Sequence, residues 1–182
     1  MQQHGCWSFV DVYDKNAIKK INVLVKKNMD STEGVDHPAE HVVKTSEVSF
    51  IPWGAIRFEL AQIEDCVRAA NRRNFAYDIF PFDASTILHY NVYKEGGEYQ
   101  WHQDMHRIED ASDIKLTVIV NLSEKSYKGG QLMLKVNDYE ELVDLTPGSI
   151  VVFKSFLSHQ VTPVTEGERV SLTTWVEGPK FR

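Results

Sequence analysis

Three residues in the second half of the chain have side chains that commonly bind a transition metal. His102 and Asp104 are separated by one residue, and His159 follows far downstream. Alternate side chains of a β-strand point to the same face, so His102 and Asp104 would project together and His159 would join them from a neighbouring strand. Two histidines and one carboxylate form the facial ligand set of non-haem Fe(II) sites. We therefore predict a metal site here, although His-x-Asp alone also fits a surface strand with two polar residues.

Arg169 follows His159 by ten residues and has a chemistry that complements a metal site. The intervening sequence turns at Glu166-Gly167, so we expect a hairpin that sets Arg169 beside His159. A guanidinium in that position can bind a carboxylate through two parallel hydrogen bonds. The alternative is a surface arginine that pairs with Glu166 or Glu168. A period of two would place Arg169, Ser171, Thr173 and Trp175 on one face of the strand.

These residues belong to a longer series of motifs in which the chain resembles a known family. The motifs are 90–104, 128–132, 147–153, 159–164 and 167–169, with Trp175 after them. In order and spacing, across roughly residues 83–176, they resemble the Fe(II)- and 2-oxoglutarate-dependent dioxygenases, specifically the prolyl 4-hydroxylase and PKHD-type hydroxylase branch. The upstream run 69–79 is also similar to PKHD-type sequences.

The resemblance implies a chemistry for the site. Fe(II) would bind His102, Asp104 and His159, and the distal carboxylate of 2-oxoglutarate would pair with Arg169, helped by Tyr93. O2 would be the oxidant, ascorbate an accessory reductant, and succinate and CO2 the by-products of C–H hydroxylation. The aspartate at 104 is typical of the family's hydroxylases. The substrate that this branch implies is a prolyl residue in a peptide or protein.

Further pocket residues follow from the same resemblance. Asn121 would share a face with Thr117 and Ile119 and line the co-substrate, and Trp175 would border the substrate channel. For Tyr93 and Trp175 the alternative is a core aromatic residue. His89 and Asn91 are polar residues at positions that should face inward, so we predict that they contact the co-substrate or its waters. For His89 the alternative is a core histidine whose hydrogen bonds are satisfied within the protein.

Two residues near the motif are expected to lie outside the ligand set. Trp101 lies between inward-facing neighbours, so we expect its side chain to face away and to pack under a helix. His106 extends the pattern to His-x-Asp-x-His. We predict that it is not a ligand, because the chain from Met105 onward is expected to form a loop.

The composition is that of an ordinary globular domain. The chain has 182 residues, 42% of them hydrophobic and 25% charged, with a net charge of −6. An acidic chain offers no basic footprint for nucleic acid. Cys6 and Cys66 make no disulfide framework or zinc cluster. We see no signal peptide and no membrane-spanning run, which favours the cytoplasm, or the host cytoplasm for a viral protein. Oligomeric state is not indicated.

The pattern of elements predicts a mostly β fold with N-terminal helices. One helix would follow Asp14 and a second would follow Pro52. Eight short strands are expected at 86–93, 98–104, 114–122, 130–136, 141–145, 149–153, 158–164 and 169–176. Such a series predicts a double-stranded β-helix, that is, a cupin-like jelly roll, with the helices packed on one sheet. We expect one domain, 1–182, with helical support in 1–82 and the catalytic core in 83–182, and a lid from 29–41 and 105–113.

Other functions remain open at this point. An AlkB-like nucleic-acid demethylase shares the triad, but the second arginine of those proteins would fall at Trp175, and the acidic charge opposes nucleic acid. A small-molecule hydroxylase is the next alternative. A non-enzymatic jelly-roll binding module is disfavoured, because the predicted ligands and Arg169 are all present.

Overall fold

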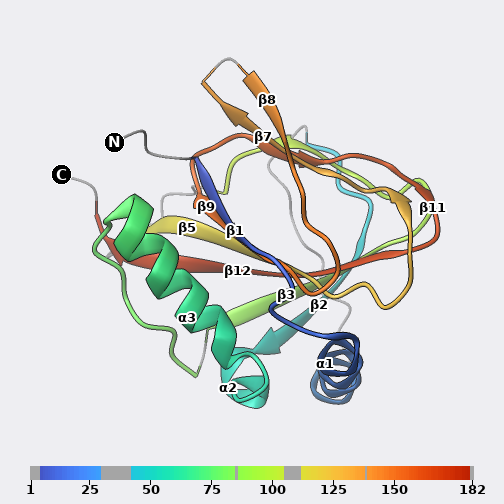
Figure 1. Ribbon diagram of the computed structural model, residues 1–182, viewed down its shortest axis with the longest axis horizontal. Coiled ribbons are helices and arrows are strands. Elements are labelled where there is room, and N and C mark those ends of the chain that lie inside the picture. The colour runs from blue at the N-terminus through green and yellow to red at the C-terminus, as the bar shows by residue number, and fades with distance from the viewer. Residues whose placement is uncertain (1–4, 30–41, 85, 105–111, 138, 181–182) are drawn as a thin grey trace.

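Two antiparallel sheets form the centre of the computed structural model, which describes residues 5–29, 42–84, 86–104, 112–137 and 139–180 (Figure 1). In the described chain the larger sheet has the order β1-β9-β5-β12-β3-β2 and the smaller one β4-β10-β7-β8. A short pair, β11-β6, accompanies them. The predicted jelly-roll class is confirmed by this arrangement.

The strands of the larger sheet are Cys6–Phe9 (β1), Glu47–Pro52 (β2), Ile87–Tyr93 (β3), Ser112–Asn121 (β5), Ile150–Lys154 (β9) and Arg169–Pro179 (β12). Those of the smaller sheet are Tyr99–His102 (β4), Leu132–Val136 (β7), Tyr139–Val143 (β8) and His159–Val161 (β10). The short pair comprises Lys128–Gly129 (β6) and Val164–Glu166 (β11). The eight strands expected from Thr86 onward therefore all occur, with shifted ends and with β6 and β11 as additional short strands.

The helices lie together on the outer side of the larger sheet (Figure 1). They are Lys15–Asn28 (α1), Trp53–Ile56 (α2) and Ala61–Ala70 (α3), and a π-helical turn, Asn71–Phe75, follows α3. Asp14 caps α1 as predicted, because its carboxylate accepts the backbone N–H of Ala17 at 2.8 Å. The single helix predicted after Pro52 is wrong, since turn residues 57–60 divide it. The apolar residues on both sides of that break are nevertheless buried, namely Ile56, Leu60, Ile63, Val67 and Ala70.

The side chains of β3 and β12 point alternately to the two faces of the larger sheet. Leu88, Tyr90 and Leu172 point outward and pack against the helices in the main core. The intervening side chains, such as Asn91 and Ser171, point between the sheets and line a cavity. A second apolar cluster, which includes Ile119, Leu134 and Phe153, joins residues of the two sheets.

A buried polar contact attaches α1 to the sheet. Asn22 donates through Nδ2 to the carbonyl oxygen of Leu122 at 3.0 Å, and the hydroxyl of Tyr90 donates to Asn22 Oδ1 at 3.1 Å. Because Tyr90 lies on β3 and Leu122 directly follows β5, this asparagine fixes where α1 sits on the sheet.

Trp101 and His106 are close to the triad in sequence but outside the predicted ligand set. Trp101 faces away from His102 as predicted but packs against Lys135, whose Nζ lies 4.3 Å from the ring centroid, and not under a helix. His106 and most of the two predicted lid segments lie outside the described residues. In the described part of the chain, no helix has the length and apolar character needed to cross a membrane.

Candidate functional site

Three side chains that can bind a metal meet beside the smaller sheet. His102 ends β4 and His159 begins β10, and the antiparallel pairing of these strands sets the two histidines opposite each other. Asp104 follows β4, where its backbone N–H donates to the carbonyl oxygen of Ser155 at 3.0 Å. The ligating atoms of the triad all lie within 4.8 Å of one another, a spacing that one metal ion can bridge. The structure thus brings together the residues that the sequence predicted as ligands.

The imidazole rings are oriented for metal binding. Nδ1 of His102 lies 2.7 Å from the carbonyl oxygen of Gln100, and Nδ1 of His159 lies 3.0 Å from that of Leu157. A carbonyl oxygen can only accept a hydrogen bond, so Nδ1 carries the hydrogen and the free lone pair is on Nε2. The Nε2 atoms of His102 and His159 lie 3.6 and 3.4 Å from oxygens of Asp104.

The Asp104 carboxylate is held from its other side. The hydroxyl of Thr117, on β5, donates to Asp104 Oδ2 at 2.7 Å. Thr117 is fully buried, so this hydrogen bond is shielded from water. Together with the backbone contact to Ser155, it sets the orientation of the carboxylate toward the histidines.

Burial keeps His102 neutral. Its side chain is 6% exposed, and desolvation, reinforced by the proximity of His159, lowers the pKa of His102 to about 4. A neutral imidazole has the free lone pair that a metal ligand requires. Tyr99 stacks on His102 with ring centroids 3.5 Å apart, and Phe153 meets the ring of His159 edge-on at 4.9 Å. Both rings are therefore held in place by aromatic neighbours.

The triad opens into a cavity of about 230 Å³ between the sheets. The wall opposite the smaller sheet consists of inward-facing residues of β3 and β12. Those residues are His89, Asn91, Tyr93, Arg169, Ser171, Thr173 and Trp175. The predicted alternation of side chains along β3 and β12 is thus confirmed. The hairpin predicted between His159 and Arg169 is wrong, because β10 belongs to the smaller sheet and β12 to the larger one, and the two residues face the same cavity from different sheets.

Arg169 is the buried cation of this wall. It is 1% exposed, its Nη1 donates to the hydroxyl of Ser171 at 3.0 Å, and its guanidinium carbon lies 5.2 Å from the ring centroid of Tyr93. Among the described residues, no partner accepts from its buried Nη2. A surface ion pair is excluded by this burial, and Glu166 pairs with Lys128 instead. An unpartnered buried donor on a cation fits an anionic ligand such as a carboxylate.

Asn121 does not line the cavity. Its Nδ2 donates to the carbonyl oxygen of Leu145 at 2.6 Å and to the hydroxyl of Tyr127 at 3.0 Å, and its Oδ1 accepts the N–H of Ser123 at 3.0 Å. The hydrogen-bonding capacity of this amide is used within the protein. The contacts therefore place Asn121 in the supporting fold, in contrast to the predicted contact with the co-substrate.

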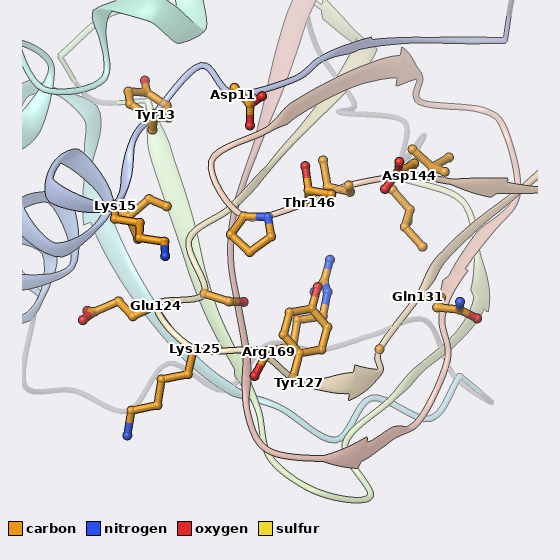
Figure 2. Close-up of a pocket in the computed structure, with 18 of the residues that line it drawn as sticks. Asp11, Tyr13, Lys15, Glu124, Lys125, Tyr127, Gln131, Asp144, Thr146 and Arg169 are labelled. Carbon is orange, nitrogen blue, oxygen red and sulfur yellow. The ribbon is translucent and has the colours of Figure 1, made fainter.

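A larger and more open groove lies behind Arg169 (Figure 2). It has a volume of about 1240 Å³ and is bordered by the start of α1, by Tyr127 and by the segment around Thr146. Arg169 borders both this groove and the cavity that contains the triad. The labelled side chains of the groove in Figure 2 carry charges of both signs, such as Lys125 and Asp144. This groove contains none of the metal-binding triad.

Sequence reasoning missed two contributors to the site. The strand period predicts the face on which Thr117 lies but not its contact with Asp104, because the two residues approach each other only in the folded chain. The stacking of Tyr99 on His102 has no signal in the sequence, since residues three apart in a regular strand point to opposite faces.

Comparison with known proteins identifies the family. The chain belongs to the 2OG-Fe(II) oxygenase superfamily, whose family model matches residues 88–177. A PKHD-type hydroxylase from Alteromonas mediterranea is 35% identical over 95 residues, which are 48% of this chain and 42% of the relative. This chain therefore spans less than half the length of that relative. Enzymes of the superfamily use Fe(II), 2-oxoglutarate and O2.

Solved structures share the fold at low sequence identity. A prolyl 4-hydroxylase from Pseudomonas putida superposes with a TM-score of 0.72 at 22% identity, covering 97% of this chain and 94% of that one. A prolyl hydroxylase from Trichoplax adhaerens, in complex with a peptide fragment of hypoxia inducible factor, has a TM-score of 0.69 at 16% identity, covering 94% and 83%. At these identities the likeness shows the fold alone.

Proposed function

We propose that this protein is an Fe(II)- and 2-oxoglutarate-dependent hydroxylase in which His102, Asp104 and His159 hold the iron. The observation that carries the proposal is the combination of two features in one cavity. The triad presents three ligating atoms within 4.8 Å, and Arg169 presents a buried Nη2 without a partner among the described residues. The first fits a transition metal and the second fits a carboxylate.

The residues of the chain have separate roles in this proposal. When bound, Fe(II) with 2-oxoglutarate and O2 supplies the oxidising power to insert oxygen into an unactivated C–H bond, with release of succinate and CO2. His102 and His159 would bind the metal through Nε2, with Nδ1 held by backbone carbonyls. Arg169 would bind the distal carboxylate of 2-oxoglutarate, and Tyr93 would border it. The two sheets exclude bulk water from these groups.

For the substrate we propose a prolyl residue in a peptide or protein. The names of relatives support this choice, since the similar proteins include PKHD-type hydroxylases and prolyl hydroxylases. The net charge of −6 also opposes a phosphate backbone. Trp175, whose side chain lines the cavity, offers an apolar surface to a pyrrolidine ring. Ascorbate as accessory reductant and a cytoplasmic location are parts of the same proposal.

The test is succinate release in the presence of Fe(II) and 2-oxoglutarate. Proline-rich peptides should raise the rate above the uncoupled background, and mass spectrometry should find one added oxygen atom on proline. Methylated oligonucleotides, assayed separately, should leave the rate at background. Stimulation by the oligonucleotide alone would contradict the prolyl assignment, and stimulation by neither would redirect the search to small molecules.

A further inference from the structure

A second unpartnered polar atom lies in the same cavity as Arg169. Asn91 is 2% exposed, and its Nδ2 donates to the carbonyl oxygen of His89 at 3.0 Å and to the hydroxyl of Thr173 at 3.4 Å. The contact with the His89 carbonyl fixes the orientation of the amide, because the reversed amide would bring two acceptor oxygens together. Asn91 Oδ1 is then a buried acceptor with no partner among the described residues.

The co-substrate cannot be the direct partner of this acceptor. The carboxylates and the keto oxygen of 2-oxoglutarate only accept hydrogen bonds, so they match Arg169 and repel Asn91 Oδ1. A buried acceptor without a partner costs free energy, and a donor group on another ligand would remove that cost. Asn91 therefore indicates a second ligand that carries an N–H or O–H group.

Trp175 presents the complementary group on the same wall. Its indole Nε1 is buried without a partner among the described residues, and an indole nitrogen can only donate. The ring of His89 meets Trp175 edge-on with centroids 4.5 Å apart, and Phe50 meets His89 edge-on at 4.6 Å. Aromatic packing thus holds the indole, while the Nδ2 contacts hold Asn91.

We propose that Asn91 and Trp175 form a primary-substrate subsite that recognises a secondary amide. The amide N–H donates to Asn91 Oδ1, and the amide carbonyl accepts from Trp175 Nε1. The proposal rests on the proposed hydroxylase function, since this amide would hold the substrate beside the metal. A prolyl nitrogen carries no hydrogen within a peptide, so the N–H comes from the residue that follows the proline.

Two probes that differ in one N–H test the subsite. N-Acetylproline N-methylamide has a single amide N–H, and N-acetylproline N,N-dimethylamide has none. Binding is measured by NMR titration of the full chain loaded with Zn(II) and 2-oxoglutarate, which does not turn over. The wild-type protein should bind the methylamide about tenfold more tightly, because the dimethylamide leaves Asn91 Oδ1 unpaired.

Substitutions at the two residues should have different effects. Asn91→Leu should remove the preference for the methylamide. Binding of the methylamide should become about tenfold weaker, while binding of the dimethylamide should change little. Trp175→Phe should weaken both probes to a similar extent, because both retain the carbonyl. Thr174→Val, on the opposite face of β12, is the control and should keep the preference. Asn91→Ala repeats the test should the leucine variant unfold.

The outcomes separate the subsite from the prolyl function. Equal binding of the two probes by the wild-type protein, or a preference that survives in both Asn91 variants, would overturn the subsite. The corresponding pair made from N-acetylsarcosine lacks the proline ring. An Asn91-dependent preference for its methylamide, without hydroxylation of any prolyl probe, would support the subsite and contradict proline as substrate.

Discussion

At the residue scale, His102, Asp104 and His159 contribute one atom each to a single cluster. Replacement of any one by alanine should abolish 2-oxoglutarate decarboxylation, because two remaining ligands do not hold the metal. Iron content and succinate release are the measurements, and circular dichroism confirms that each variant folds. Near-wild-type turnover in any variant would remove that residue from the proposed ligand set.

Replacement of Arg169 should weaken the binding of 2-oxoglutarate more than the binding of Fe(II). Arg169→Ala should weaken 2-oxoglutarate binding about ten- to a hundredfold, since a charge-assisted hydrogen bond contributes about 1.5–3 kcal/mol. Arg169→Lys should have a smaller effect, because the charge remains and the planar fork is lost. Calorimetric titration of 2-oxoglutarate into the metal-loaded protein measures both. An unchanged affinity in the alanine variant would show that another group binds the distal carboxylate.

Thr117 should strengthen Fe(II) binding through its hydrogen bond to Asp104. Thr117→Val keeps the shape of the side chain and removes the hydroxyl that donates to Asp104 Oδ2. We expect about ten- to a hundredfold weaker Fe(II) binding, the usual effect of losing a hydrogen bond to a metal ligand. Thr174→Val makes the same change at a buried position outside the cavity and should leave Fe(II) affinity unaltered. Equal affinities in the two variants would mean that the backbone contact to Ser155 suffices to orient the carboxylate.

At the element scale, strand register decides whether the triad forms. The pairing of β4 with β10 sets His159 opposite His102, and both imidazoles turn inward. A shift of one residue in either strand would turn a histidine to the outer face, because side chains alternate. The register of β4 and β10 is therefore a condition for the metal site.

The turn before β9, in the larger sheet, contains a close backbone contact whose contribution to stability can be measured. Gly148 has φ +86°, and a Cβ there would lie 2.0 Å from the carbonyl oxygen of Tyr13. Gly148→Ala should lower the free energy of unfolding by about 2–4 kcal/mol, through backbone strain and the steric clash together. Gly96, with φ +82°, has open space around it, so Gly96→Ala should cost only about 1–2 kcal/mol. Urea denaturation measures the free energy of unfolding of both variants. Equal decreases in the two would contradict the role of close packing at Gly148.

At the scale of the whole molecule, the helices and the larger sheet share one core. Ile21 of α1 and Ile63 of α3 are buried with Leu88 and Leu172 in a single cluster. We therefore predict that residues 1–182 unfold as one domain, with a single calorimetric transition. A fragment that begins at residue 83 should fail to fold as a soluble monomer, because the outer face of the sheet would be exposed. Two transitions, or a folded fragment, would contradict the single-domain prediction.

The sequence by itself determined which side chains share a face and which chemistry they offer. A strand period of two separated Arg169 and Ser171 from Val170 and Leu172, and the His-x-Asp spacing paired His102 with Asp104. These are local properties, since the direction of a side chain follows from its own backbone.

Only the tertiary structure decided how far along each strand the cavity extends and which polar groups remain unpaired. Ile119 and Asn121 lie on one face of β5, yet only Ile119 reaches the cavity, because the amide of Asn121 is bound by Leu145, Tyr127 and Ser123. Asn91 is also a buried asparagine, but its Oδ1 has no partner among the described residues. The difference arises from contacts between segments distant in sequence, and a local pattern does not contain them.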